Sequence, residues 1–386
     1  MIKAATIKLR EGFTRRAGQN MGEALKKQLG QAPNACWLFC APLEGMDNLL
    51  KGIRESIGTG NLVGCTSAGD ISSDGVGINS AVLGGIATDQ IDFEIVAATG
   101  LGRDSEAAGR QLARAFSRTP RYIQIFSDGI TGNGSAILKG IASVLGEHIP
   151  VAGGTAGDND RYQKTMQFAG DGIYTDAICG IAFYGDFHLG TGVRSGWVPI
   201  GLTKKVTRSS GPVVYELNGE PALNVYERFL GKHAEKLPAI GVEYPLCLLE
   251  RWGDVGQEDY FLMRATMSVD REDRSITFAG EVPEGAMVNM TCGDSASILN
   301  AAEKAVKMAL SDLGGLPPAI AFCYSCTARK TVLGRRCQEE IDRVRNLVGS
   351  EVPIIGFYTY GEYSRVTPWS PNYLHNETFT VSLIGI

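Results

Sequence analysis

Three stretches of the chain share one pattern: "NLVGCTSAGDI" (61–71), "IPVAGGTAGDN" (149–159) and "VPIIGFYTYGEY" (352–363). In each, a short apolar run with strand character meets a turn of glycine and small residues, which closes with Gly-Asp or Gly-Glu. Glycine permits positive φ angles and a close approach of the backbone to its neighbours. A turn that is built three times indicates a repeated unit, and it raises the question of what the turns hold.

Two of these turns end a longer strand–helix–strand pattern. The first copy consists of "RYIQIFSDG" (121–129), "SAILKGIASVLG" (135–146) and the turn at 149–158. The second consists of "AIAFCYSC" (319–326), "CQEEIDRVRNLVG" (337–349) and the turn at 352–362. In both, the apolar residues of the middle segment recur at helical spacing. The sequence therefore predicts an α/β fold of two related, pseudo-duplicated halves with mixed sheets. In such units ligands bind at the loops that follow the strands.

Length and composition narrow the class of protein. At 386 residues the chain exceeds the usual size of one domain, so two domains are expected, 1–198 and 199–386. A net charge of −5 argues against nucleic-acid binding, and no apolar run of about 18 residues predicts a membrane helix. Nine cysteines, an odd number, together with an N-terminus that lacks a secretory signal, favour a reduced, cytoplasmic setting.

The glycine spacing of two turns resembles that of a phosphate-binding P-loop, but the residues that follow do not. Gly64-x4-Gly69 leads into Asp70, and the matching glycines of the third stretch lead into Glu362, where a P-loop carries Lys and Ser or Thr. A carboxylate at that place repels phosphate. Two interpretations of the turns stay open: glycine serves geometry alone, or exposed N–H groups and an acid line a pocket.

Taken together, these blocks make the chain similar to the FIST family, bacterial sensory proteins with an N-terminal and a C-terminal FIST domain. The blocks that carry the resemblance are "VGCTSAGDI" (63–71), "FSDG" (126–129), "PVAGGTAGDN" (150–159), "GWVPIG" (196–201), "VVYELNGEPALNVYERFLG" (213–231), "FAGEVPEGAMV" (278–288), "CTAR" (326–329), "GFYTYGEY" (356–363) and "HNET" (375–378). They lie in order over nearly the whole chain. The resemblance implies a protein of signal transduction, not an enzyme, that senses a small ligand and passes the signal to a separate protein.

A free-standing subgroup of the family, similar in length to this chain, comprises haem-containing nitric-oxide sensors that act on partner histidine kinases. The resemblance therefore implies two alternatives for the ligand, nitric oxide on haem or an amino acid. It implies a histidine kinase or another signalling protein as the partner and leaves homo-oligomers open. The sequence shows no kinase, cyclase or DNA-binding motif, so any output acts in trans.

The predicted ligand site takes its residues from the three turns and the "CTAR" block: Cys326, Arg329, Glu362, Tyr358, Tyr360, Asp70 and Asp158. Arg329 offers a planar fork to a carboxylate, and the acids offer oxygens to an ammonium group. We expect Arg329 to face either Glu362 or a ligand anion, in one pocket with Cys326 and the turn at 64–70. The alternative is that each acid bonds the backbone of its own turn.

Haem needs an axial ligand and an apolar slot. The chain has four histidines: His148, His188, His233 and His375. His188 follows a predicted strand and lies outside the matched blocks, so it is the first choice as cofactor and metal ligand. His375, in the "HNET" block, is the second candidate for cofactor binding, and a Cys or Tyr ligand stays open.

An enzyme is the alternative of a different class. Cys326 and His375 both lie in matched blocks, and together they supply a thiol nucleophile and a base. The sequence identifies no third group that orients the base. We therefore expect a binding protein and not an enzyme.

Overall fold

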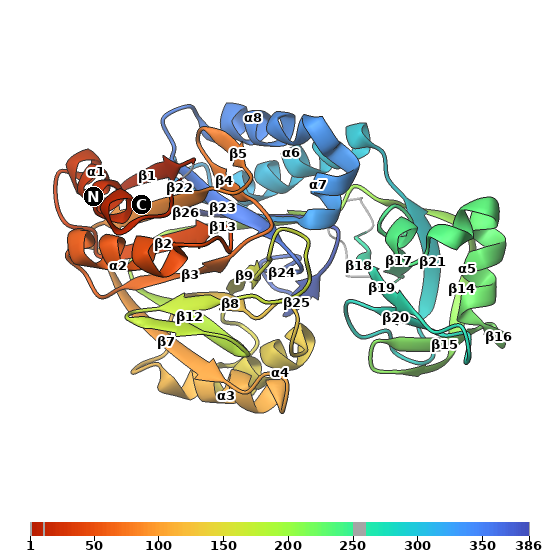
Figure 1. Cartoon of the computed structure of the whole chain (residues 1–386). Coiled ribbons are helices and arrows are strands. Elements are labelled where there is room, and N and C mark those ends of the chain that lie inside the picture. The colour runs from red at the N-terminus through yellow and green to blue at the C-terminus, as the bar shows by residue number, and fades with distance from the viewer. Residues whose placement is uncertain (1, 11, 250–259, 386) are drawn as a thin grey trace.

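The computed structural model describes residues 2–10, 12–249 and 260–385 of the chain. In it, three mixed six-stranded sheets share one strand order, and a further sheet of eight strands forms a separate domain (Figure 1). The predicted α/β class, with mixed sheets and strand–helix–strand units, is confirmed. The structure adds a third copy of the unit, at residues 35–66, to the two copies that the sequence predicts.

Each repeat passes through the same series of elements. The first has β1 (Lys3–Leu9), α1 (Arg15–Leu29), β2 (Ala35–Cys40), α2 (Met46–Ile57), β3 (Leu62–Thr66), β4 (Asp70–Ser72), β5 (Gly75–Gly77) and β6 (Ala81–Ala87). The second has β7 (Ile91–Thr99), α3 (Ser105–Ala115), β8 (Tyr122–Ser127), α4 (Gly134–Leu145), β9 (Val151–Thr155), β10 (Gln167–Ala169), β11 (Gly172–Tyr174) and β12 (Ala177–Gly185). The third has β13 (His188–Arg194), α6 (Ser295–Asp312), β22 (Pro318–Cys326), α7 (Thr327–Leu333), η3 (Gly334–Arg336), α8 (Cys337–Val348), β23 (Ile354–Thr359), β24 (Glu362–Arg365), β25 (Asn372–His375) and β26 (Phe379–Gly385).

The three repeats exchange strands in a closed ring. The sheets have the orders β1-β6-β2-β3-β10-β11, β7-β12-β8-β9-β24-β25 and β13-β26-β22-β23-β4-β5. The last two strands of every sheet therefore come from another repeat. The first repeat completes the sheet of the third, the third completes that of the second, and the second completes that of the first. No repeat can form its whole sheet alone, so the body of the protein folds as one unit.

The central parallel pair of each sheet depends on one glycine. Gly64, Gly153 and Gly356 pair with a residue of the neighbouring parallel strand. A Cβ atom at these glycines would lie 1.9, 2.0 and 1.6 Å from the carbonyl oxygen of that residue. The requirement for close backbone approach explains why the predicted turns are rich in glycine.

We expect Gly153→Ala to lower the free energy of unfolding by at least about 2 kcal/mol, because the new Cβ meets backbone that cannot move aside. Gly153 also has a φ of 129°, which side chains with a Cβ rarely adopt. Urea denaturation measures the effect. Gly60→Ala is the matched control, since a Cβ at Gly60 has no neighbour within 4 Å. Equal stability of the two variants would contradict this account of the glycines.

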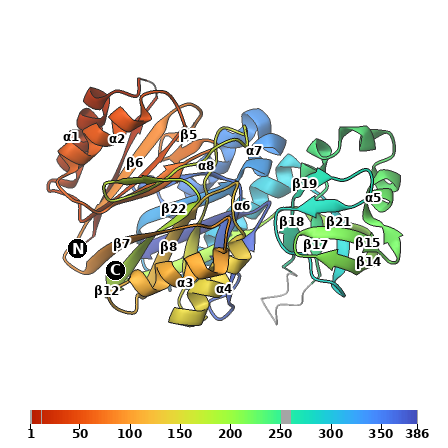
Figure 2. The ribbon, with the colours of Figure 1, turned by 60° about the horizontal axis from the view of Figure 1, so that its bottom comes forward.

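The core of the body lies where the three sheets face one another. Phe39, Phe126 and Tyr324 hold the same position in β2, β8 and β22. Their ring centroids are 5.2 Å (Phe39–Phe126), 6.1 Å (Phe126–Tyr324) and 6.4 Å (Phe39–Tyr324) apart. Because one aromatic residue from each repeat meets the other two, the repeats are arranged around a common pseudo-threefold axis. The helices cover the outer faces of the sheets (Figure 2).

A separate β domain is inserted into the third repeat, between β13 and α6. It consists of β14 (Val198–Ser210), β15 (Val213–Leu217), β16 (Glu220–Pro221), α5 (Ala222–Leu230), η1 (Gly231–Lys236), η2 (Ala239–Val242), β17 (Leu246–Leu248), β18 (Leu262–Arg264), β19 (Thr266–Val269), β20 (Ile276–Phe278) and β21 (Met287–Cys292). It lies at one end of the molecule, to the right in Figure 1, and has its own apolar core. The predicted boundary at 198/199 falls inside β14, at its first two residues.

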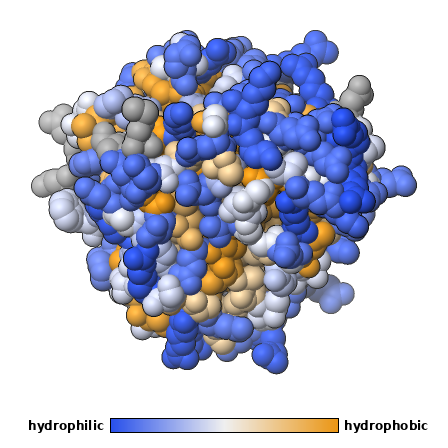
Figure 3. Space-filling model, turned by 90° about the vertical axis from the view of Figure 1, so that its left-hand side faces the viewer, coloured by the Kyte–Doolittle hydropathy of each residue, from blue (hydrophilic) through white to orange (hydrophobic). Residues whose placement is uncertain are grey.

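One face of the body is mainly polar. On the face turned toward the viewer in Figure 3, hydrophilic side chains cover most of the area, and apolar ones form smaller patches between them. Within the described ranges, no helix combines the length and the apolar character that a membrane crossing requires.

Candidate functional site

The three turns quoted above meet at one end of the core. Backbone hydrogen bonds join them in pairs: Gly157 N–H to Thr66 O (3.0 Å), Thr155 N–H to Gly361 O (2.8 Å) and Ala68 N–H to Tyr358 O (3.0 Å). The turns follow parallel strands of three different sheets, so the ring of repeats brings them to the same place. The expectation that they converge is therefore correct, although they converge from three units and not from two.

The acids that close the turns are not all equivalent. Asp70 and Glu362 begin β4 and β24, and each pairs with the neighbouring repeat at the same register. The third residue at this register is Gln167, not Asp158. Asp70 accepts a hydrogen bond from Ser80 Oγ and lies 3.6 Å from Lys8 Nζ, so its ion pair is structural.

Asp158 caps a loop. Its carboxylate accepts hydrogen bonds from the N–H groups of Tyr162 (2.8 Å), Gln163 (2.7 Å) and Lys164 (3.0 Å) and from the hydroxyl of Tyr360. Burial acts to raise the pKa of Asp158, but these hydrogen bonds outweigh it and hold the pKa below its usual value. Asp158 therefore bonds its own turn, which is the alternative left open by the sequence.

Residues 156–166, which we call the lid loop, contain three residues with unusual backbone angles. Asn159, Asp160 and Tyr162 have φ values of 58°, 61° and 52°, in the left-handed region that costs energy without glycine. Asp160 accepts hydrogen bonds from Thr327 Oγ1 (2.5 Å) and Lys330 Nζ (2.6 Å) on α7. The ring of Tyr162 stacks on Tyr360 at 4.3 Å. These contacts hold a strained loop against the "CTAR" segment.

Arg329 is buried and pairs with Glu340, not with Glu362, which was one of the two partners expected for it. Its guanidinium is fully buried and bonds Glu340 Oε1 through Nε (3.0 Å) and Nη2 (2.7 Å). It also donates to the carbonyl oxygens of Ser195 and Ile298. Tyr358, a predicted pocket wall, is buried with its hydroxyl 3.4 Å from Glu340. Arg329 thus ties α7 to α8, to α6 and to Ser195, which directly follows β13. With these partners its guanidinium has no pair of N–H groups left for a ligand carboxylate.

Beneath the lid loop lies a group that we call the acidic centre: Cys326, Glu362, Asn376 and Glu377. All four residues are buried, at 3%, 0%, 1% and 0% exposure. The backbone N–H of Cys326 donates to Thr378 O (2.9 Å), and Thr378 in turn donates to Glu362 through its hydroxyl (2.7 Å) and its N–H (3.2 Å). Glu362 also accepts from Thr359.

Burial is the largest influence on the protonation of the acidic centre. It raises the pKa of Glu362 to about 7, against hydrogen bonds from Thr359 and Thr378 and the charge of Arg329. Burial, and then the charge of Glu362, raise the pKa of Glu377 well above its usual range. Burial and both carboxylates raise the pKa of the Cys326 thiol, so Cys326 is a protonated thiol and a weak nucleophile.

The other two repeats provide an internal comparison for Glu377. A left-handed residue stands just before the last strand of each repeat: Asn79, Asp176 and Glu377, with φ values of 57°, 51° and 61°. Asn79 accepts a hydrogen bond from Asn159, and Asp176 accepts from Gly102 N–H and Thr131 Oγ1. Neither carboxyl oxygen of Glu377 has a hydrogen-bond partner in the part of the chain that is described, and neither has Asn376 Oδ1.

Cys326 has a structurally equivalent residue in the second repeat. Asp128 stands at the same place after β8, and its carboxylate accepts from the N–H groups of Ile130 (2.9 Å), Thr131 (3.0 Å) and Asp176 (3.1 Å). At Cys326, hydrogen bonds from Ala328 and Glu377 N–H act to lower the pKa of the thiol. At this position the second repeat has a carboxylate that accepts hydrogen bonds from its own turn, and the third repeat has a thiol. The thiol lies beside Asn376 Oδ1 and the carboxyl group of Glu377, which have no partner among the described residues.

The histidines do not fit a haem. His188 is exposed at the start of β13, an edge strand, and His148 and His233 are exposed as well. His375 is buried, and both ring nitrogens are engaged, Nδ1 with the Tyr260 hydroxyl (2.6 Å) and Nε2 with Ser364 O (3.0 Å). An axial ligand needs a free nitrogen in an apolar slot, which none of these provides. Burial lowers the pKa of His375 to about 3, and its two partners also exclude it as a base for Cys326.

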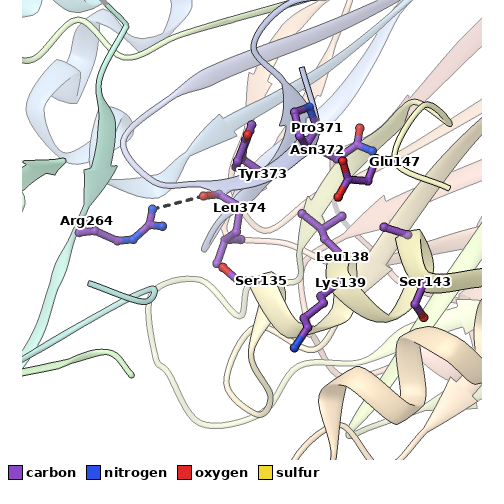
Figure 4. A pocket seen from close by; sticks show the side chains of 11 residues that line it. Ser135, Leu138, Lys139, Ser143, Glu147, Arg264, Pro371, Asn372, Tyr373 and Leu374 are labelled. Atoms are coloured by element: carbon purple, nitrogen blue, oxygen red, sulfur yellow. Dashed lines mark hydrogen bonds between the residues drawn. The ribbon is translucent and has the colours of Figure 1, made fainter. Parts of the chain in front are cut away.

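A second candidate is the groove where the inserted domain meets the body (Figure 4). Its volume is about 430 Å³, and Arg264 reaches across it to Leu374 O at 3.3 Å. It is lined by Ser135, Leu138, Lys139, Ala142, Ser143, Glu147, Arg264, Pro371, Asn372, Tyr373 and Leu374. None of the residues predicted from the sequence lies in it, and its polar groups come from scattered surface positions.

Sequence reasoning found Cys326 and Glu362 but missed Asn376 and Glu377. The signal was present, because both residues belong to the "HNET" block that supports the family resemblance. A charged residue in a strand-connecting turn is usually solvated, so only the burial seen in the structure distinguishes Glu377 from a surface acid.

Comparison with known proteins places the chain in a family. The FIST N domain matches residues 34–220, and the FIST C domain matches residues 222–365. An uncharacterized protein of Methanocaldococcus jannaschii is 25% identical over 292 residues, 70% of this chain and 54% of that protein, so the chain spans about half of this relative. Uncharacterized proteins of Mycobacterium bovis and Mycobacterium tuberculosis are 23% identical over 373 residues, 94% of this chain and 93% of each relative.

Among solved structures, a cyanuric acid hydrolase from A. caulinodans aligns with 99% of both chains at 9% identity and a TM-score of 0.37. The two domain matches cover most of the chain, including the turns, the "CTAR" segment and all of the inserted domain except Pro221. The chain therefore belongs to the FIST family, whose domains sense small ligands in signal transduction.

Proposed function

We propose that this chain is a cytoplasmic sensor that binds its small ligand at the acidic centre, under the lid loop, and signals in trans. The candidate for the receiving protein, supplied by the family resemblance, is a histidine kinase. Asp160 holds the lid loop to α7 by hydrogen bonds, and Tyr162 holds it to Tyr360 by stacking, so release of these contacts would give the ligand a route of entry. Binding then changes the position of a strained segment at the surface, which a partner can read.

One observation carries the proposal: Glu377 is fully buried, and both of its carboxyl oxygens lack a hydrogen-bond partner among the described residues. A buried polar group left unpaired costs on the order of 1–3 kcal/mol. Natural proteins retain a buried polar group without a partner where a ligand or a reaction uses that group. The counterparts Asn79 and Asp176 have partners, so the fold itself does not require the defect.

The test combines stability with ligand response. We expect Glu377→Gln to fold and to be at least as stable as the wild type, because an unpaired ionisable group is replaced by a neutral one. In a thermal-shift screen against small metabolites, ligands that raise the Tm of the wild type should not raise that of Glu377→Gln. Hydrogen exchange should slow at residues 156–166 and 375–378 when they bind.

Glu339→Gln is the matched control for this test, since Glu339 is an exposed glutamate whose side chain is 47% accessible. It should respond to ligand as the wild type does. If metabolites stabilise the wild type and Glu377→Gln equally, the ligand binds elsewhere and the proposal fails.

Haem-based sensing of nitric oxide stays a prediction of the resemblance, and the histidines described above do not support it. The visible spectrum of the purified protein, before and after addition of hemin, tests it directly. A Soret band that His188→Ala removes would establish that version. We expect no such band to depend on His188, because this residue is exposed on an edge strand.

A further inference from the structure

We infer that the ligand of the acidic centre is a small organic cation rich in N–H donors, an ammonium or amidinium compound without a carboxylate. The inference rests on the proposed function and specifies its ligand. It follows from counting the hydrogen-bonding groups that the centre leaves open and the charges around it.

The open groups are acceptors. Both oxygens of Glu377 and Oδ1 of Asn376 are buried without a partner in the described ranges. Glu362 contributes a second carboxyl group whose oxygens already accept from Thr359 and Thr378. Once Glu377 is ionised, a ligand that satisfies this set must donate, and a cation both favours the ionised form and donates the strongest hydrogen bonds.

The neighbouring cations are already committed, so an amino acid fits poorly. The guanidinium of Arg329 bonds Glu340 and two carbonyl oxygens. Lys330 Nζ bonds Asp160 and Ala68 O. A carboxylate brought to the centre would find no uncommitted cation to pair with, and its charge would be buried beside two carboxyl groups that burial already holds toward their neutral form. The predicted amino-acid ligand therefore lacks the group that was expected to hold its carboxylate.

A bare metal ion also fits poorly. Across the part of the chain with described positions, no three His, Cys, Asp or Glu side chains are placed so that they could share a metal. An organic cation needs fewer converging oxygens, because its own atoms fill space and its N–H groups point in fixed directions. Tyr162, which lies near enough to Cys326 and Glu377 to respond to their charges, stacks on Tyr360, so aromatic rings of the kind that attract cations stand beside the centre.

Binding of a cation releases protons from the acidic centre. The groups that face Glu377 are Glu362 from β24, Cys326 from β22, Arg329 from α7 and Tyr162 from the lid loop. A bound cation favours the charged form of both carboxyl groups, so binding expels protons and strengthens as the pH rises. A neutral ligand has no such dependence.

Matched probes test the ligand class. Propylamine and propionamidine carry the cation, 2-aminobutyrate adds a carboxylate to propylamine, and 1-propanol removes the charge. In calorimetric titrations at pH 7.5 we expect propylamine or propionamidine to bind at least about tenfold more tightly than 2-aminobutyrate and 1-propanol. Glu377→Gln should weaken the binding of the cation by about tenfold or more, and Glu339→Gln should not change it. Titrations in buffers of different ionisation enthalpy should show proton release.

Each outcome decides between the two claims. If 2-aminobutyrate or 1-propanol binds as tightly as the amine and Glu377→Gln abolishes that binding, the ligand class is wrong and the proposed site stands. If a cation binds equally well to Glu377→Gln, the site itself is wrong. If neither cation binds at millimolar concentration, the inference about the ligand class is overturned, and the metabolite screen alone decides the site. Asn376→Ala serves as a second variant should Glu377→Gln not fold.

Discussion

Arg329→Met is expected to lower the free energy of unfolding by about 3–5 kcal/mol, because it leaves the buried carboxylate of Glu340 without its cation. Arg329 and Glu340 are both fully buried, and their closest atoms are 2.7 Å apart. The guanidinium also satisfies the carbonyl oxygens of Ser195 and Ile298, which lose their donor in the variant. The loss should appear as a lower urea midpoint with an unchanged m-value.

The control is Arg336→Met, which removes the same kind of ion pair at the surface. The side chains of Arg336 and Glu339 are 44% and 47% exposed, so this change should cost less than about 1 kcal/mol. The double variant Arg329→Met/Glu340→Met should be less destabilised than the sum of its single changes, because the uncompensated charge is then gone. A loss below about 1 kcal/mol in Arg329→Met would show that Arg329 is not structural and would reopen its role in ligand binding.

The free energy of unfolding is expected to fall as the pH rises from 5 to 8. Burial raises the pKa of Glu362 from the ordinary value of 4.5 to about 7 in the folded protein. Between these values the folded protein binds more protons than the unfolded chain, so each step to higher pH favours unfolding. For a shift of this size the loss from pH 5 to 8 is about 2–3 kcal/mol. Glu377, whose pKa is also raised, acts in the same direction.

Glu362→Gln should remove the part of this slope that Glu362 contributes, about 2–3 kcal/mol between pH 5 and 8, and make the protein more stable than the wild type at pH 8, while the slope from Glu377 remains. Urea denaturation at pH 5, 6.5 and 8 measures the effect, and Glu339→Gln should keep the wild-type slope. A wild-type stability that rises over this range would mean that Glu362 is ionised in the folded protein. The acidic centre would then contain a counter-charge that the described residues do not reveal.

Several parts of the fold were determined by the local sequence. The alternating and helical spacing of apolar residues in 121–158 and 319–362 predicts two strand–helix–strand units, and both are present. The glycines of the turns predict close backbone approach, which Gly153 shows. These features depend on contacts between residues near one another in the chain, so a pattern in one stretch is enough to predict them.

The ring of repeats was not predictable in the same way. The hairpin β4–β5 leaves its own repeat and completes the sheet of the third, and nothing in residues 70–77 indicates that partner. Strand pairing between repeats depends on which edges are free after each repeat has folded. The third copy of the unit, at 35–66, was not predicted from the sequence and appears only in the structure.

The contents of the site were decided by tertiary packing. The sequence named Arg329 and Glu362 as candidate site residues and left two partners open for Arg329, namely Glu362 or a ligand anion. Arg329 pairs with Glu340 instead, because α8 directs the side chain of Glu340 inward against β22. There Glu340 also accepts a hydrogen bond from Ser325. Glu377 looks like a turn residue in the sequence, and it becomes a buried acid without a partner among the described residues only when β22, β24 and the lid loop pack around it. The sequence alone determined the units and the family, since those follow from local spacing and composition. Which charges meet and which remain unpaired was decided by contacts between distant segments.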